Sequence, residues 1–394
     1  MHPIVIIGSG IAGYTVAREL RKLDKTSPLL IITADDGGFY SKPMLSNACA
    51  HNKQAKDLIN QTAEQMAAQV NASSLTGTKV DHIDTATNKV VTNAGNFEYS
   101  KVVIALGAQA IRLPIAGDAA AQVLSVNHLD DYALFREQIA ATGESARITI
   151  LGAGLIGCEF ADDLAGAGHK VTLVDPNPLP LAALAPQAIS LGLQDALLKR
   201  GITLQLGTTA SSIHKAPDGD ALQVTLANGS LVNADLVLSA VGLRPKLRMA
   251  TASGLQTDRG ILINAYGETS AANIYALGDC AQYQVTGGAQ QVLPYIAPLM
   301  VAARAIARNL LGESTVIDLK PSPVIVKTPS FPVAVVPPGI KDLANGRWET
   351  ELNDGVTISR FFDASNRLSG FAVAPHDARL RTRLLAELAE FTEA

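Results

Sequence analysis

The chain has 394 residues, of which 47% are hydrophobic and only 17% charged, and its formal net charge is −4. This length exceeds one average domain, and the composition excludes a disordered, collagen-like or coiled-coil protein. A nucleic-acid-binding protein normally carries a basic surface, so the slightly acidic charge counts against that class. No apolar stretch is long enough to span a membrane, and we expect no signal peptide because an apolar strand begins near Pro3.

The three cysteines, Cys49, Cys158 and Cys280, lie far apart in the sequence. They form no CxxC pair and lack the ligand spacing of a zinc site, so we predict neither a redox dithiol nor a metal site. Scattered cysteines without a disulfide framework are typical of a reducing compartment. We therefore predict a cytoplasmic protein.

A glycine-rich turn follows the first predicted strand. The apolar residues 4–7 lead into Gly8-Ser9-Gly10-Ile11-Ala12-Gly13, and a helix to about Leu23 and a strand over 29–33 follow. In this pattern the first glycine allows a tight turn, the second lets a pyrophosphate approach the backbone, and the third packs the helix against the strand. The segment therefore predicts a dinucleotide-binding unit.

A near-copy of this unit occurs later in the chain. The apolar residues 148–151 lead into Gly152-Ala153-Gly154-Leu155-Ile156-Gly157, then a helix to about Ala167 and a strand over 170–174. One such turn is weak support for nucleotide binding, but two in the same strand–turn–helix context are strong. We therefore predict an α/β protein that binds two dinucleotides.

The second copy ends its second strand at Asp175. A carboxylate at this position accepts hydrogen bonds from a ribose 2′-hydroxyl and repels a 2′-phosphate. The following residues, Pro176-Asn177-Pro178, include no arginine that could receive such a phosphate. We predict NADH rather than NADPH, bound by Gly152, Gly154, Gly157 and Asp175; the alternative is a solvated aspartate at the end of a strand.

The pattern changes after about residue 316, where prolines punctuate apolar strands. Predicted strands over 348–352, 356–362 and 368–374 are separated by short turns, and a helix follows over 378–391. This arrangement predicts an antiparallel meander closed by a helix, which forms a small α+β domain.

Three further segments resemble the flavin fingerprints of two-dinucleotide flavoproteins. They cover residues 102–108, 238–245 and 269–279, and the last resembles the motif whose aspartate, here Asp279, holds the ribityl chain of FAD. The resemblance implies two Rossmann-like domains, one for FAD and one for NAD. It places an FAD-binding domain over 1–112 and 245–316, an NAD-binding domain over 113–244 and a C-terminal α+β domain over 317–394.

Within this group the chain resembles the branch of ferredoxin and rubredoxin reductases. Thiol-using relatives carry a CxxC pair or a Leu-Ser-Cys stretch, whereas this chain has Leu45-Ser46-Asn47, so electrons must leave the flavin directly. Residues 31–37, 40–46, 151–163 and 326–329 are similar to the rubredoxin reductases in particular. Cys49, two positions later, is interpreted as a small buried hydrophobe.

This resemblance implies an oxidoreductase that takes a hydride from NADH onto FAD. Because electron delivery needs no second subunit, we expect a monomer. Single electrons then pass to rubredoxin, a small acidic iron protein that supplies an alkane hydroxylase. Two alternatives stay open: a ferredoxin or flavorubredoxin reductase of another system, and a non-catalytic NADH-sensing flavoprotein.

The resemblance also assigns roles to residues at the flavin. Lys42 is expected at the flavin N5 edge, paired with Glu159, which lies in an apolar helical run where an unpaired charge is costly. These two residues are the predicted catalytic pair, with Lys42 stabilising negative charge that develops on the flavin. The predicted FAD-binding residues are Gly8, Ser9, Gly10, Ile11, Ala12, Gly13, Thr33, Ala34, Lys42, Val80, Glu159, Asp279, Val292 and Lys327.

An acidic partner protein requires a locally basic docking surface. Two clusters of basic residues in predicted helices are candidates for such a surface. They are Arg18, Arg21 and Lys22 near the start of the chain, and Arg379, Arg381 and Arg383 near its end. The alternative for each is an ordinary solvated helix face.

Overall fold

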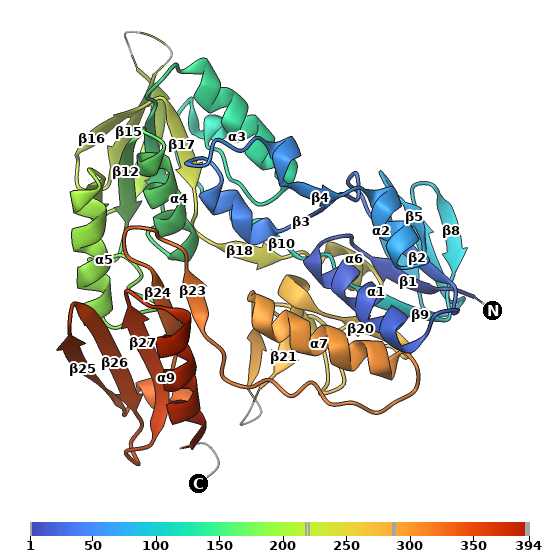
Figure 1. Cartoon of the computed structure of the whole chain (residues 1–394). Coiled ribbons are helices and arrows are strands. Elements are labelled where there is room, and N and C mark those ends of the chain that lie inside the picture. The colour runs from blue at the N-terminus through green and yellow to red at the C-terminus, as the bar shows by residue number, and fades with distance from the viewer. Residues whose placement is uncertain (1, 217–218, 220, 286–288, 391–394) are drawn as a thin grey trace. The chain divides into compact units, whose positions relative to one another are not determined.

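The computed structural model describes residues 2–216, 219, 221–285 and 289–390, which fall into two compact units. The first unit comprises the residues up to Lys42, Lys56–Gln109 and Leu243–Lys320. The second comprises Pro43–Ala55, Ala110–Gly242 and the residues from Pro321 onward. The segment Pro43–Ala55 therefore groups with the second unit, although the resemblance to two-dinucleotide flavoproteins places it inside the first domain (Figure 1).

The core of the first unit is a five-stranded parallel sheet with the order β20-β9-β1-β2-β5. Most of its strands are continuous apolar runs because helices cover both faces of such a sheet. The helices α1 and α7 contact each other. The strands are β1 (Ile4–Ile7), β2 (Leu29–Ile32), β5 (Ser73–Leu75), β9 (Lys101–Ile104) and β20 (Ile274–Ala276), and the helices are α1 (Ile11–Leu23), α2 (Ala63–Gln69), α6 (Arg248–Ala252) and α7 (Ile296–Asn309).

Smaller sheets complete the first unit. A three-stranded antiparallel sheet is formed by β6, β7 and β8, while β21 pairs with both β19 and β22. Two short pairs, β3 with β4 and β10 with β18, lie outside these sheets. The bounds are β3 (Phe39–Tyr40), β4 (Ile59–Gln61), β6 (Val80–Asp84), β7 (Lys89–Thr92), β8 (Gly95–Glu98), β10 (Ala108–Ala110), β18 (Leu243–Pro245), β19 (Ile261–Leu262), β21 (Ala281–Gln284) and β22 (Gln290–Val292).

The second unit contains a four-stranded parallel sheet of order β13-β12-β11-β17 and an antiparallel sheet of order β14-β15-β16. The helix α4 connects β11 to β12, as a crossover between parallel strands requires. The bounds are α3 (Leu129–Ala141), β11 (Arg147–Leu151), α4 (Leu155–Gly166), β12 (Lys170–Asp175), α5 (Gln187–Lys199), β13 (Thr203–Leu206), β14 (Ala210–Lys215), β15 (Leu222–Leu226), β16 (Leu231–Ala234) and β17 (Leu236–Ser239).

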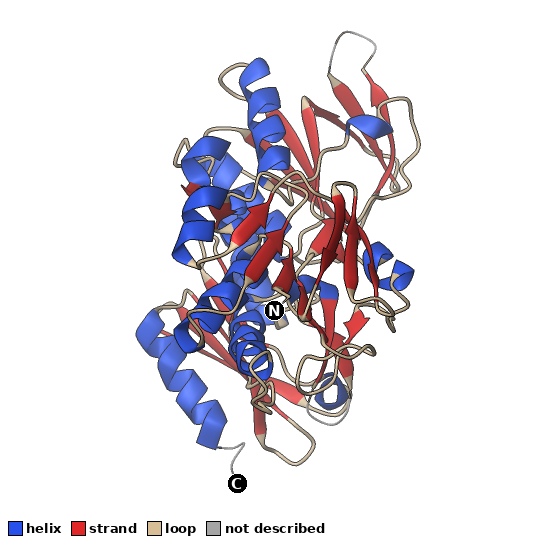
Figure 2. Cartoon of the chain, turned by 90° about the vertical axis from the view of Figure 1, so that its right-hand side faces the viewer, coloured by secondary structure: helices blue, strands red, loops and turns tan. Residues whose placement is uncertain are grey.

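The last part of the second unit is an antiparallel sheet of order β23-β24-β27-β26-β25. The helix α9 packs on it through Leu384 and Leu388, which join the apolar core of this sheet (Figure 2). The predicted meander and closing helix are thus confirmed up to Glu390; Phe391, the predicted last residue of the helix, lies outside the described residues. The bounds are β23 (Val324–Val326), β24 (Val333–Val336), α8 (Ile340–Leu343), β25 (Arg347–Asn353), β26 (Val356–Phe362), β27 (Leu368–Ala374) and α9 (Ala378–Glu390).

The predicted fold class is confirmed: each unit contains one Rossmann-like parallel sheet, and the second unit also contains the small α+β C-terminal domain. Among the described residues, no helix is both long and apolar enough to cross a membrane. In the same part of the chain, no three His, Cys, Asp or Glu side chains are grouped as metal ligands.

The side chain of Arg21 in α1 is buried. Its guanidinium donates hydrogen bonds to the backbone carbonyls of Val70 at 2.6 Å, Ser27 at 2.8 Å, Asn71 at 2.8 Å and Asp24 at 3.1 Å. These bonds tie the end of α1 to the two loops beside it. Arg21 is therefore a structural residue.

The other two members of this predicted basic cluster are also engaged. Arg18 lies over the ring of Phe39, 4.4 Å from its centroid, and Lys22 pairs with Glu19 at 2.7 Å. In the sequence, the i, i+3, i+4 spacing of these three residues indicated one basic helix face. The three residues do not form a free basic surface, because the side chain of Arg21 points into the protein.

We expect Arg21→Met to lower the free energy of unfolding by about 2–4 kcal/mol, because buried carbonyl groups lose their donor. Lys22→Met, one residue away on the exposed side, is the control and should change it by less than about 0.5 kcal/mol. Urea denaturation followed by circular dichroism measures both. Equal stability of the two variants would contradict the structural role of Arg21.

Candidate functional site

The first glycine-rich turn joins β1 to α1 with a backbone that other residues do not readily adopt. Gly8 has φ +112°, and a Cβ atom there would lie 2.4 Å from the carbonyl oxygen of Ala105. Gly10 precedes α1 without a side-chain cap, and a Cβ at this position would meet nothing within 4 Å. An uncapped helix start beside open space suits an anionic diphosphate, so this turn fits the diphosphate of FAD.

Side chains at the end of β2 hold this turn in place. The Ser9 hydroxyl donates to Thr33 Oγ1 at 2.9 Å and to Asp35 Oδ1 at 3.0 Å, and Thr33 also donates to Asp35. Among the predicted FAD residues, Ser9 and Thr33 are thus in direct contact, with Ala34 between Thr33 and Asp35. Asp35 itself was missed; its position just after the strand was the only signal in the sequence.

Lys42 and Asp279 form an ion pair in the first unit, with Nζ 3.7 Å from Oδ2. Asp279 lies in the short 3₁₀ turn Gly278–Cys280 that follows β20. Gly278 has φ +74°, and a Cβ there would lie 3.1 Å from the Cβ of Ala12, at the start of α1. The predicted residues Lys42, Asp279 and Ala12 therefore belong to one region. Val80 begins β6 and Val292 ends β22 in the same unit.

The second glycine-rich turn repeats the geometry of the first between β11 and α4. Gly152 has φ +105°, and a Cβ there would lie 2.7 Å from the carbonyl oxygen of Ala240. Gly154 precedes α4 without a side-chain cap, with open space at its Cβ position. This turn fits the diphosphate of NADH for the same physical reason.

Asp175, at the end of β12, is buried beside this turn. Its Oδ2 accepts a hydrogen bond from the Ala153 amide at 2.6 Å. Its Oδ1 accepts two bonds of 2.8 Å from Asn177, one from the backbone amide and one from the side chain. The carboxylate is therefore held next to the turn; its expected repulsion of a 2′-phosphate stays a prediction. Asn177 was not predicted, since an exposed asparagine carries no signal in the sequence.

Glu159 in α4 is completely buried, and its carboxylate accepts three hydrogen bonds within the second unit. Lys327 donates to Oε2 through Nζ at 2.6 Å and to Oε1 through its backbone amide at 2.8 Å. Ser46 donates to Oε2 at 2.5 Å. Glu159 and Lys327 are thus brought together as an ion pair, which the sequence did not predict. The predicted pairing of Glu159 with Lys42 stays a prediction.

Two further carboxylates of α4 are buried and bind neighbouring segments. Asp163 accepts hydrogen bonds from the backbone amides of Cys49 at 2.8 Å and Ala50 at 3.1 Å, and burial raises its pKa. Asp162 accepts bonds of 2.8 and 2.9 Å from the backbone amide and hydroxyl of Ser330. One helix therefore anchors both the segment after Lys42 and the loop after β23.

The three cysteines are free and buried, as expected. Burial raises the pKa of Cys49 to about 11 and that of Cys280 to about 11, and it also raises the pKa of Cys158. Since the thiolate is the reactive form, none of these side chains is ready for thiol chemistry near neutral pH.

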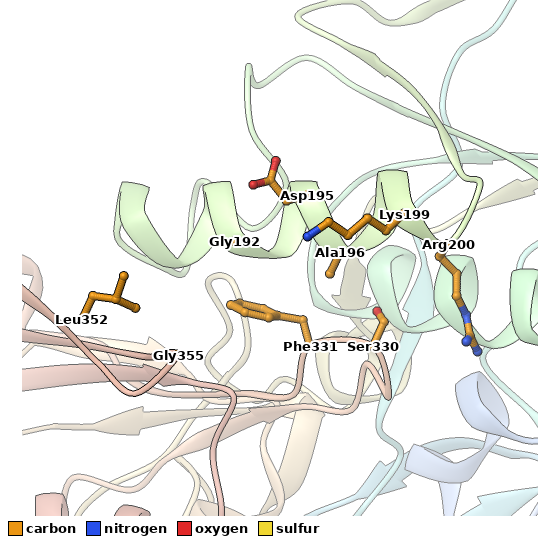
Figure 3. Close-up of a pocket in the computed structure, with 9 residues that line it drawn as sticks. All are labelled: Gly192, Asp195, Ala196, Lys199, Arg200, Ser330, Phe331, Leu352 and Gly355. Atoms are coloured by element: carbon orange, nitrogen blue, oxygen red, sulfur yellow. The ribbon is translucent and has the colours of Figure 1, made fainter.

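A cavity of about 620 Å³ lies elsewhere in the second unit, between α5 and the C-terminal sheet (Figure 3). The ring of Phe331 lies against Gly192, where a Cβ would approach it to 2.5 Å. None of the predicted site residues lines this cavity. Its lining residues are Gly192, Asp195, Ala196, Lys199, Arg200, Ser330, Phe331, Leu352 and Gly355.

Comparison with known proteins identifies two families along the chain. Residues 2–303 match the family "Pyridine nucleotide-disulphide oxidoreductase", and residues 316–388 match "Rubredoxin binding C-terminal domain". The chain is 42% identical to the rubredoxin-NAD(+) reductase of Alcanivorax borkumensis over 388 residues, which is 98% of this chain and 99% of that protein. It is 44% identical to that of Acinetobacter baylyi over 377 residues, covering 95% and 94%.

A solved structure shares the fold. The covalent putidaredoxin reductase–putidaredoxin complex contains a chain that superposes with a TM-score of 0.88 at 24% identity, covering 99% of this chain and 93% of that chain. At this level of identity the likeness supports the fold alone.

We expect Ser46→Ala to lower the free energy of unfolding by about 1.5–3 kcal/mol, because the buried Glu159 anion loses one of its three donors. Ser190→Ala is a matched control: Ser190 is also fully buried in the second unit, and its hydroxyl has no hydrogen-bond partner among the described residues. Urea denaturation of both variants measures the difference. A loss as large for Ser190→Ala would show that the bond to Glu159 is not the cause.

Proposed function

Because the chain belongs to the pyridine nucleotide-disulphide oxidoreductase family, we propose that it is an NADH-dependent flavoenzyme that reduces rubredoxin. One observation carries the choice of acceptor: residues 316–388 match a rubredoxin-binding domain. The similarity to two rubredoxin-NAD(+) reductases over nearly the whole chain supports it.

The two glycine-rich turns supply the cofactor sites. In the first unit the turn Gly8–Gly13, with Ser9 and Thr33 behind it, holds the diphosphate of FAD, and Asp279 holds its ribityl chain. In the second unit Gly152, Gly154 and Gly157 hold the diphosphate of NADH, and Asp175 accepts its ribose hydroxyls. FAD, when bound, accepts two electrons together from NADH and releases them one at a time.

Lys42 is the charged residue of the first unit that acts on this chemistry. The cation of Lys42, oriented by Asp279, stabilises negative charge on the flavin ring. Glu159 and Lys327 form a pair whose charges compensate each other, so neither is left as an isolated buried ion. The buried cysteines leave no thiol to take up electrons, and the electrons therefore pass directly from the flavin to the acceptor.

We also propose a cellular compartment, an oligomeric state and a downstream role for this enzyme. Free, reduced cysteines fit a cytoplasmic enzyme. Delivery of single electrons to a small iron protein needs no second subunit, so we propose a monomer. Supply of an alkane hydroxylase is the downstream role that the resemblance implies.

The purified enzyme loaded with FAD should oxidise NADH rapidly in the presence of rubredoxin and cytochrome c, and much more slowly when a ferredoxin replaces rubredoxin. The rate with limiting rubredoxin should fall steeply as salt is added, because attraction between the two proteins is screened. Stopped-flow or steady-state spectrophotometry measures both. A higher rate with the ferredoxin would identify ferredoxin as the acceptor. If NADH is oxidised with neither acceptor, the protein is a sensor and not an enzyme.

Asp175→Ala should raise the KM for NADH about tenfold, since a hydrogen bond to a charged group is lost and the turn loses its anchor at Ala153. The kcat should change little, because Asp175 contacts the adenosine half of the cofactor. Preference for NADH over NADPH should decrease. Asp195→Ala, an exposed aspartate of the same unit, is the control. An unchanged KM in Asp175→Ala is the contrary result.

A further inference from the structure

Most cations in the rubredoxin-binding match, residues 316–388, are already engaged with carboxylates. Arg360 bonds to Glu351 and Glu387, each at 2.7 Å. Arg367 pairs with Asp363 at 2.9 Å. A cation in such a pair attracts an approaching acidic protein less strongly, because the neighbouring anion compensates its charge.

The other ion pairs of this domain also place a carboxylate next to each cation. Arg347 pairs with Glu349, Lys320 with Asp318, and Lys327 with the buried Glu159. Lys341 also has an interaction partner, and Arg381 lies 3.4 Å from His376 Nδ1.

Arg379 and Arg383 differ from all of these. Both are exposed, and neither has a hydrogen bond or an ion pair to another described residue of the domain. The pKa of Glu351 is lowered mainly by its hydrogen bond from Arg360, and the charge of Arg383 contributes only weakly. These two guanidinium groups are therefore available to a partner.

Arg379 and Arg383 lie on one exposed side of α9. Residues four apart lie on the same side of a helix, one turn above the other. The apolar side of α9 is turned to the sheet through Leu384 and Leu388. Arg379 and Arg383 consequently present two positive charges, about one helical turn apart, to solvent.

The carboxylates nearest to the two arginines along α9 already have other partners. The Oδ1 atom of Asp377 accepts a hydrogen bond from the Leu380 amide at 2.7 Å and so caps α9, whereas the first turn of the helix itself holds no acidic residue. Glu387, four residues after Arg383, pairs with Arg360 at 2.7 Å.

We propose that Arg379 and Arg383 form a docking site for the acidic surface of rubredoxin. This inference rests on the proposed function, because it concerns how that acceptor is recognised. It also resolves the choice between the two basic clusters, since Arg18, Arg21 and Lys22 are engaged within the first unit.

The experiment compares two double variants and one single variant of the full-length, FAD-loaded enzyme. Arg379→Gln with Arg383→Gln removes both charges, and Arg379→Lys with Arg383→Lys retains them. Arg347→Gln is the matched control, because it removes an exposed arginine of the same domain that is paired. Each variant is assayed with rubredoxin over a range of ionic strength, and with ferricyanide, a small acceptor that needs no protein docking.

The Gln double variant should raise the KM for rubredoxin about fivefold or more and flatten its salt dependence, since rim charges act through the rate of association. The kcat, the ferricyanide rate and the midpoint of thermal unfolding should not decrease. The Lys double variant and Arg347→Gln should behave like the wild type. A shift in KM that also occurs in Arg347→Gln would mean a general charge effect and overturn the proposal.

Different results would contradict the docking site and the proposed function. If the wild-type enzyme reduces rubredoxin and the Gln double variant keeps the same KM and salt dependence, the docking site is wrong while the proposed function stands. If the wild-type enzyme itself does not reduce rubredoxin, the proposed function is wrong and the docking site with it.

Discussion

In both parallel sheets, the helix after the glycine-rich turn lies so close to the preceding strand that only a hydrogen atom fits between them. A Cβ atom at Gly13 would lie 2.0 Å from the carbonyl oxygen of Gly8, and one at Gly157 would lie 1.8 Å from that of Gly152. This contact directs the start of each helix at the carboxyl end of its sheet. Because neither helix start has a side-chain cap, the dipole is left for an anionic diphosphate, and both nucleotide sites depend on this one constraint.

The second of these helices, α4, also holds together segments of the second unit that are far apart in the sequence. It carries three buried carboxylates, and a buried carboxylate is tolerated only when donors satisfy it. The donors come from the segment after Lys42 and from the loop after β23, with Ser46 and Lys327 on Glu159. The helix that begins at the NADH turn therefore also holds the segment that follows Lys42 and connects the C-terminal domain to the same unit.

Charge on the C-terminal domain is distributed unevenly. Its cations are largely matched by nearby carboxylates, whereas the exposed Arg379 and Arg383 lie one helical turn apart on α9 with no ion pair to another described residue. A slightly acidic protein can attract an acidic partner in this way, because encounter depends on the local field of a surface and not on net charge.

The sequence alone determined the features that depend on residues close together in the chain: the two glycine turns, the C-terminal meander and its helix, and the absence of a CxxC pair. It also showed that a carboxylate at position 159 needs a partner, but not which one, since Ser46 and Lys327 are separated from it by 113 and 168 residues. Helical spacing likewise placed Arg18, Arg21 and Lys22 on one face without showing that Arg21 points inward. Only the tertiary structure decided these points, because burial and pairing depend on which distant segments pack against a helix, and periodicity within one helix carries no information about its neighbours.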